Sequence, residues 1–217
     1  ILRHSGIPLI YDIAEDKDSI CIIEEFISGK SLTEYVAEHR MLTAAQITDF
    51  MLQICDILEY LHSQGSKGMV HLDLKPDNIL ITDTGSVKLI DFDNAVRMGE
   101  RYATHYGSIG FAAPEQYHRL YQDCRADIYS LGMLILYMDN GHVQCHAESL
   151  HHKKFYPIVK KCIHHSIWQR YRSVKQVRQA VYSLQAENEL SENIKAQNIS
   201  LYGTKHGVGT THIALCL

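Results

Sequence analysis

The segment HLDLKPDN, residues 71–78, constrains this chain more than any other stretch, because it gathers charged and amide side chains around one tight turn. The turn contains Pro76, whose fixed φ suits a turn better than the interior of a strand or helix. Asp73 and Asn78 flank it, and both side chains are predicted to point inward. An aspartate and an asparagine in a loop are usually turn chemistry, so their meaning depends on the residues that follow.

The residues after this turn predict a β-hairpin that leads the chain back to it. The short apolar runs 79–81 and 87–90 are joined by TDTG, a sequence typical of a turn. A hairpin of this length returns the chain so that Asp91 faces Asn78. The sequence therefore predicts that polar side chains from two separate segments meet at one point.

The rest of the chain predicts a second hairpin followed mainly by helices. The β-branched runs 8–13 and 20–26 are separated by the acidic stretch EDKD and form the hairpin. Ser31 and Thr43 are candidate N-caps of two helices. Helices are predicted where apolar residues recur three and four positions apart or dominate, over residues 31–40, 43–61, 127–138, 155–164 and 174–184.

The composition argues against several classes of protein. The 217 residues carry 21 Lys and Arg against 25 Asp and Glu, and this net charge of −4 argues against a dedicated nucleic-acid binder. No apolar run reaches the roughly 18 to 20 residues that span a bilayer. The six cysteines form no Cys-x-x-Cys pair, and we interpret them as reduced thiols of a cytoplasmic protein.

Three motifs in this order resemble the catalytic half of a eukaryotic-type protein kinase. They are HLDLKPDN (71–78), DFD (91–93) and APE (113–115), and the resemblance covers residues 1–185. It implies an α+β fold with a partial β N-lobe and a mainly α-helical C-lobe. The lysine two residues after Asp73 resembles the pattern of serine/threonine kinases. The run FAAPEQY resembles the corresponding run of bacterial members. The implied function is ATP-dependent phosphoryl transfer to Ser/Thr hydroxyls of protein substrates.

The resemblance implies a role for each residue of the central motifs. Asp73 would accept the proton of the substrate hydroxyl, and Lys75 would neutralise charge on the transferring phosphate. Asn78 and Asp91 would hold Mg²⁺ through hard oxygen ligands. Ser108 would hydrogen-bond Asp73 and Lys75. ATP and Mg²⁺ are therefore the expected cofactors.

The resemblance also identifies a hinge that meets adenine and an unusual residue beside it. The backbones of Glu25 and Ile27, together with Phe26, would contact the adenine ring of ATP. Glu24 stands where an apolar residue usually lines the back of the adenine pocket. A carboxylate buried there is costly unless it is paired, so an atypical pocket is expected.

Supporting residues match the family as well. Asp127, in DIYSLG, would hold the backbone of the catalytic loop from a buried helix. Arg170 would pair with Glu115, and such a buried pair serves to position the fold more than to stabilise it.

The chain departs from the family in several places. It lacks the Gly-rich loop, the strand lysine and the helical glutamate of the front of the domain, so we expect a piece of a longer protein that by itself binds ATP poorly. Leu72 replaces an arginine that in many kinases grips a phosphorylated activation loop, and Asp93 replaces a glycine. The alternative function is a pseudokinase, a binding module that regulates an attached domain.

The C-terminal residues resemble the start of a second domain. Residues 186–198 are interpreted as a linker, and residues 199–217 read as a strand, a Gly-rich loop and the start of a helix. This order is similar to the deviant Walker-A loop of partitioning-type ATPases. A P-loop ATPase with a kinase-like appendage is a third, weaker possibility. The residues that would bind phosphate and Mg²⁺ are Lys205, Gly207, Gly209 and, for the metal, Thr211.

Overall fold

A computed structural model describes the arrangement of most of the chain. The described residues are 2–17, 20–99, 107–118, 123–143 and 146–196. Within them, no helix combines the length and the apolar character needed to cross a membrane.

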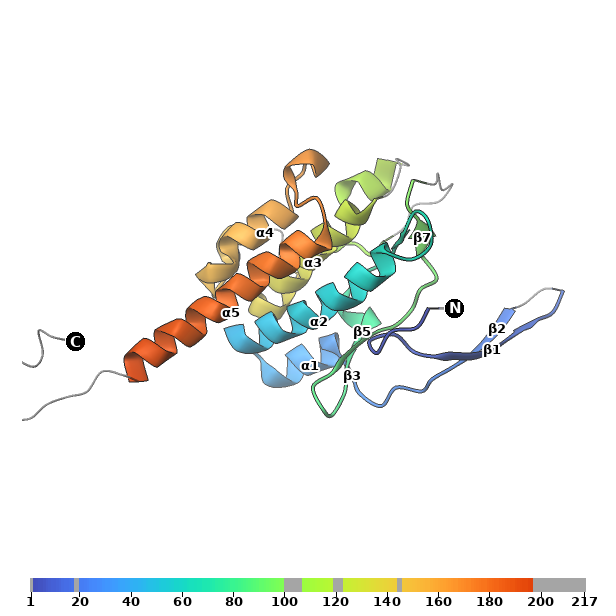
Figure 1. Cartoon of the computed structure of the whole chain (residues 1–217), viewed down its shortest axis with the longest axis horizontal. Coiled ribbons are helices and arrows are strands. Elements are labelled where there is room, and N and C mark those ends of the chain that lie inside the picture. The colour runs from blue at the N-terminus through green and yellow to red at the C-terminus, as the bar shows by residue number, and fades with distance from the viewer. Residues whose placement is uncertain (1, 18–19, 100–106, 119–122, 144–145, 197–217) are drawn as a thin grey trace, which may run out of the picture. The chain divides into compact units, whose positions relative to one another are not determined.

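The N-terminal β-hairpin forms as predicted. Strand β1 (Ile10–Glu15) pairs antiparallel with β2 (Ile20–Glu24), with an irregular register between Ile10 and Asp12. The hairpin projects away from the helices (Figure 1). Its apolar side chains, Ile13 among them, are therefore largely exposed.

Two capped helices follow, and both predicted N-caps are confirmed. Helix α1 (Leu32–His39) begins at Ser31 and α2 (Ala44–His62) begins at Thr43. In each case the cap hydroxyl accepts the amide of the third helical residue, whose own side chain bonds back to the cap. Such capping boxes fix where a helix begins, because they satisfy amides that have no partner inside the helix.

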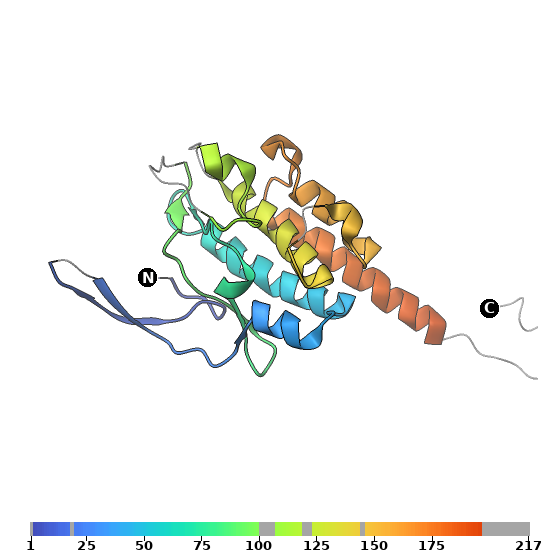
Figure 2. The same ribbon diagram turned by 180° about the vertical axis from the view of Figure 1, so that it is seen from behind.

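The core lies between α2 and the helices that pack around it. Helix α3 (Cys124–Asn140) is buried along most of its length, as its continuous apolar sequence predicts. It packs against α2 on one side and α4 (Tyr156–Cys162) on another, and Figure 2 shows this layer from behind. Large side chains from all three helices join one hydrophobic core, among them Met51, Leu134 and Val159.

Short strands and turns connect the helices. The predicted hairpin is β5 (Ile79–Ile81) with β6 (Val87–Leu89), and β3 (Lys30–Ser31) joins its edge. A separate pair is formed by β4 (Met69–Val70) and β7 (Val96–Arg97). Single 3₁₀ turns cover Pro76–Asn78, Pro114–His118, Ala147–Ser149, Lys153–Phe155 and Ile167–Gln169.

The last helix is longer than predicted. Helix α5 (Val174–Ala196) continues past Leu184, where the sequence analysis ends it. The apolar stripe stops at that point, but most of the residues beyond it are good helix formers, and none is Gly or Pro. Contacts divide the chain into residues 1–184 and 185–217, so the helix leaves the first unit there.

A buried ion pair ties the 3₁₀ turn Pro114–His118 to the end of the helical body. Arg170 donates from both terminal nitrogens to the two carboxylate oxygens of Glu115, at 2.6 and 2.8 Å. Both residues are buried. The predicted pairing is confirmed.

Removing one partner of this pair is expected to destabilise the fold strongly. Arg170→Met leaves the Glu115 carboxylate buried without its cation, and we expect a loss of about 3–5 kcal/mol of unfolding free energy in urea titrations. Arg178→Met is the control, because Arg178 is 43 % exposed and pairs with Asp56 at the surface, so at most about 1 kcal/mol is expected. Equal losses in the two variants would contradict the structural weight assigned to the buried pair.

Candidate active site

Three side chains converge on the carboxylate of Asp73. Ser108 Oγ donates to Oδ1 at 2.8 Å, and Lys75 Nζ donates to Oδ2 at 2.9 Å. Asn78 Nδ2 donates to the backbone carbonyl of Asp73 at 2.9 Å and reaches Oδ2 at 3.3 Å. The predicted Ser108–Asp73 bond is confirmed, whereas Ser108 and Lys75 bind opposite oxygens of Asp73 instead of each other.

These bonds set the charge of the site. Burial raises the pKa of Asp73, but the hydrogen bonds from Lys75 and Ser108 outweigh it and hold that pKa below its ordinary value. The hydrogen bond to Asp73 in turn raises the pKa of Lys75, against a smaller effect of burial. At neutral pH the site therefore holds a carboxylate, a proton acceptor, beside a fixed cation.

A buried aspartate from α3 fixes the loop that carries Asp73. Asp127 accepts the backbone amides of His71 and Leu72, both at 2.9 Å, which confirms its predicted role. It also accepts His62 Nε2 at 2.8 Å, a contact that the sequence analysis missed. Leu72 has a φ of 66°, a left-handed conformation that costs a leucine roughly 1–3 kcal/mol and persists only when its surroundings enforce it.

Apolar side chains surround Leu72, where many kinases have an arginine. Leu72 is fully buried and packs in a small cluster of its own. The other members are Val70, Val96, Ala113 and Ala126. A cluster of this composition provides no cation to bind a phosphate group. An apolar leucine in place of the arginine therefore suits its apolar surroundings.

His71 is buried as a neutral ring beside the site. Burial lowers the pKa of its imidazole, although Asp127, Asp73 and Asp91 oppose this effect. The ring lies edge-on to Phe92, with centroids 5.1 Å apart. A histidine that must stay neutral in the folded state makes the stability of the fold depend on pH.

We expect the fold to lose stability as the pH falls below about 6.5, where an unfolded histidine takes up a proton that buried His71 does not. By pH 5 the unfolding free energy is expected to have fallen further in the parent than in His71→Gln, measured by urea titration at pH 7 and pH 5. His146→Gln, which replaces an exposed ring, is the control and keeps the parent's pH dependence. An unchanged pH dependence in His71→Gln would refute this assignment.

Asp91 lies at the strand end next to Asn78, as the hairpin predicts. The amide of Ile90 donates to the carbonyl of Asn78 at 2.9 Å, which brings the following residue beside the loop. Asp91 has a φ of 62°, and its Oδ1 accepts the amide of Asp93 at 3.3 Å. Its charge contributes to the raised pKa of Lys75, so it lies within electrostatic reach of the Asp73 cluster.

The donor atoms at this point fit Mg²⁺. Asn78 uses its Nδ2 for Asp73, which leaves the amide oxygen as a ligand beside the exposed carboxylate of Asp91. No three His, Cys, Asp or Glu side chains in the described part of the chain are grouped to hold a metal ion. An ion held here would therefore complete its shell with phosphate and water oxygens, which is usual for Mg²⁺.

A cavity of about 670 Å³ adjoins Asp91 and has the size of a ligand pocket. Its walls are mainly apolar, with acidic residues both at the hinge and at Asp91 and Asp93. The lining residues are Pro8, Ile10, Ile22, Glu24, Glu25, Phe26, Ile27, Leu80, Ile90, Asp91, Phe92 and Asp93. The predicted hinge and the predicted metal ligand Asp91 thus face one cavity, which suits a ligand with an apolar ring and a charged tail.

The hinge is anchored through Glu25. Its amide donates to the carbonyl of Leu9 at 2.8 Å, and its carboxylate accepts the amide of Leu9 at 3.2 Å. Lys88 lies 3.5 Å from the same carboxylate. The carbonyl of Glu25 and the amide of Ile27 remain the candidate contacts for adenine. Glu24 lines the same cavity but its side chain is exposed, so no carboxylate is buried at this position.

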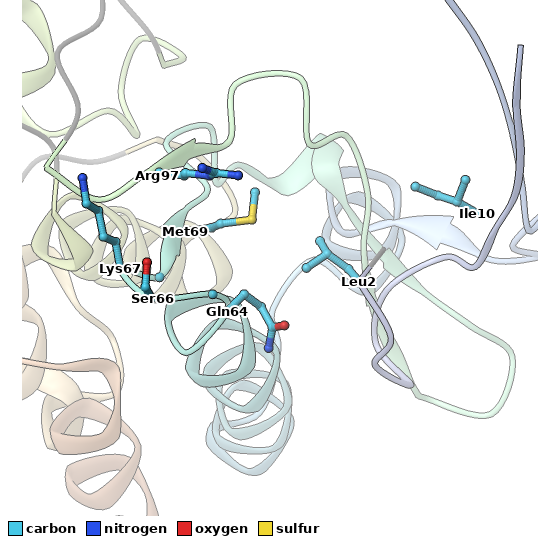
Figure 3. Close-up of a pocket in the computed structure, with 9 residues that line it drawn as sticks. Leu2, Ile10, Gln64, Ser66, Lys67, Met69 and Arg97 are labelled. Carbon is cyan, nitrogen blue, oxygen red and sulfur yellow. The ribbon is translucent and has the colours of Figure 1, made fainter.

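A second cavity, of about 500 Å³, lies on another part of the surface (Figure 3). It is bounded by Leu2, the turn from Gln64 to Met69, and Arg97, with Lys67 at one side. Apart from Ile10, its lining differs from that of the first cavity, and it includes none of the predicted site residues.

The predicted phosphate-binding residues of the C-terminal segment cannot be compared with the structure, and one buried residue near the site was not predicted. Lys205, Gly207, Gly209 and Thr211 lie outside the described residues. The buried Gln116, which bonds to the carbonyl of Leu72 at 2.8 Å, was missed by the sequence analysis. It follows the APE motif, but nothing in the local pattern marks it as buried.

Comparison with known proteins agrees with this geometry. A family model described as "Protein kinase domain" matches residues 1–196. A probable serine/threonine-protein kinase of Clostridium acetobutylicum is 33 % identical over 152 residues, and the serine/threonine-protein kinase PrkC of Bacillus subtilis is 32 % identical over 152 residues. Each match covers 68 % of this chain but only 23 % of the relative, so the chain spans about a quarter of these proteins. The chain belongs to the protein kinase domain family.

Proposed function

We propose that the protein transfers the γ-phosphoryl group of ATP to serine and threonine hydroxyls of other proteins. The observation that carries this proposal is the convergence of Lys75, Ser108 and Asn78 on the Asp73 carboxylate. A substrate hydroxyl next to Asp73 would give up its proton to this carboxylate as its oxygen attacks the γ-phosphorus, and the bond from that phosphorus to the bridging oxygen would break to release ADP. Lys75 stays protonated beside it and neutralises charge on the transferring group.

The nucleotide would occupy the cavity next to Asp91. The apolar side chains of Leu80, Ile90 and Ile22 suit the faces of adenine, and the Glu25 carbonyl and Ile27 amide suit its polar edge. Asn78 and Asp91 would hold Mg²⁺, which supplies charge neutralisation and orientation of the phosphates when bound. A nucleotide held in this way would have its terminal phosphate between the Mg²⁺ ligands and Asp73.

The choice of serine and threonine over tyrosine rests on two points. Lys75 stands two residues after Asp73, a spacing that resembles serine/threonine kinases. The matched relatives named above carry the words serine/threonine-protein kinase in their names.

A phosphate-transfer assay tests the proposal. The full-length protein is incubated with γ-³²P-ATP, Mg²⁺ and a general protein substrate, and phosphoamino acids are separated after hydrolysis. Labelled phosphoserine or phosphothreonine that disappears with EDTA supports the proposal. Magnesium-dependent ATP binding without any transfer would favour the pseudokinase alternative instead.

The C-terminal segment and the location of the protein also remain proposals. Residues 199–217 are proposed to begin a P-loop ATPase-like domain, with Lys205 as its signature lysine; the support is the order of strand, Gly-rich loop and helix in the sequence. A cytoplasmic location is proposed from the cysteine pattern, and the four described cysteines, Cys21, Cys55, Cys124 and Cys162, are free thiols.

A further inference from the structure

Gln116 is a buried side chain that connects two parts of the site. It is 2 % exposed and lies in the 3₁₀ turn Pro114–His118. Its Nε2 donates to the carbonyl of Leu72 at 2.8 Å, and its Oε1 accepts the amide of Ala113 at 2.8 Å. One amide side chain therefore bonds both to the loop that carries Asp73 and to the segment that follows Ser108.

The bond to Leu72 acts on a strained peptide. The backbone of Leu72 is left-handed, and a residue other than glycine keeps this conformation only where neighbouring groups hold it in place. Asp127 holds the amide of Leu72 from one side, and Gln116 holds its carbonyl from the other. That carbonyl belongs to the peptide that leads directly into Asp73, so Gln116 fixes the direction from which Asp73 enters the site.

Gln116 also borders the backbone that leads into Ser108. A Cβ added to Gly107 would lie 2.7 Å from Gln116 Nε2 and 3.0 Å from the carbonyl of Leu72. The chain therefore passes directly over the Gln116–Leu72 hydrogen bond at the residue before Ser108. Ser108 Oγ donates a hydrogen bond to Asp73. The residue before each of these two partners, Gly107 and Leu72, therefore lies next to the amide of Gln116.

We propose that Gln116 is a positioning residue that keeps Asp73 and Ser108 in register for phosphoryl transfer. This inference rests on the function proposed above. Gln116 does not line the nucleotide cavity, so its loss acts on kcat and leaves the KM for ATP nearly unchanged.

Two variants separate the two bonds of Gln116, and a third is the control. Gln116→Met removes both bonds at similar size, whereas Gln116→Glu keeps an acceptor for Ala113 but loses the donor to Leu72. Gln53→Met is the matched control: Gln53 accepts the amide of Val87 at 2.8 Å and donates to the carbonyl of Gly85 at 3.2 Å, away from Asp73. All are measured in the full-length protein, by steady-state kinetics and by hydrogen exchange.

We expect kcat to fall at least tenfold in both Gln116 variants, with KM for ATP within twofold of the parent. Gln53→Met is expected to keep kcat within twofold. Hydrogen exchange is expected to rise in residues 71–75 and 107–113 only in the Gln116 variants. An unchanged kcat in Gln116→Glu, or unchanged exchange in both segments, would overturn the proposal. If the parent transfers no phosphate, the proposed function fails, and the exchange comparison still decides the role of Gln116.

Discussion

Replacing Asp73 with asparagine in the full-length protein is expected to lower kcat for phosphate transfer by at least about 100-fold, the usual contribution of a general base. Asparagine keeps the size of the side chain and an oxygen for Ser108, but it cannot accept a proton or pair with the charge of Lys75. Phosphate incorporation into protein, measured under saturating ATP, checks this expectation.

The matched control for this variant lies in the same loop. Asp77 is exposed and accepts a hydrogen bond from Thr33 at 2.7 Å, and asparagine can still accept that bond. Asp77→Asn is therefore expected to keep kcat within about twofold, since surface substitutions seldom change more. Equal activity of Asp73→Asn and the parent would remove Asp73 from the proposed chemistry.

Replacing Asp91 with alanine is expected to abolish magnesium-dependent transfer, with a loss on the order of 1,000-fold, because metal-ion stabilisation supplies several kcal/mol. The alanine variant keeps the hairpin but removes the carboxylate next to Asn78. Asp83→Asn, at the exposed turn of the same hairpin, is the control. The affinity for ATP is titrated with and without Mg²⁺, and a parent-like gain from Mg²⁺ in Asp91→Ala would show that the ion is held elsewhere.

The sequence was sufficient for the parts of the fold that depend on local chemistry. Capping residues fixed the starts of α1 and α2, and the TDTG turn fixed the hairpin that carries Asp91. The buried partners Asp127 and Arg170 were predicted only because the residues around them resemble a known family.

Features that depend on tertiary contact were not predictable in the same way. Strands β4 and β7 have two residues each, too short to show a period of two. Gln116 is buried by the fold of a distant loop around Leu72, and no local pattern encodes that contact. Helix α5 continues after its apolar stripe ends, through residues that favour a helix without a regular apolar pattern, so periodicity placed its end too early.

The apolar surroundings of Leu72 affect whether phosphorylation can activate the protein. The apolar cluster around Leu72 offers no cation that could bind a phosphate group. Because Leu72 stands where many kinases have a phosphate-binding arginine, we expect that phosphorylation between Asp91 and Glu115 is not a strong activating switch here. The test is the transfer rate of the full-length protein before and after phosphatase treatment, and a manyfold loss would contradict it.

We propose that Asn78 and Asp91 hold one divalent cation beside the carboxylate of Asp73. Anomalous diffraction from crystals of the full-length protein with Mn²⁺ and a non-hydrolysable ATP analogue measures this directly. The account predicts a metal peak about 2.0–2.3 Å from oxygens of both Asn78 and Asp91, with the terminal phosphate directed toward Asp73. A metal bound elsewhere, with the nucleotide outside the cavity lined by Glu25 and Ile27, would contradict it.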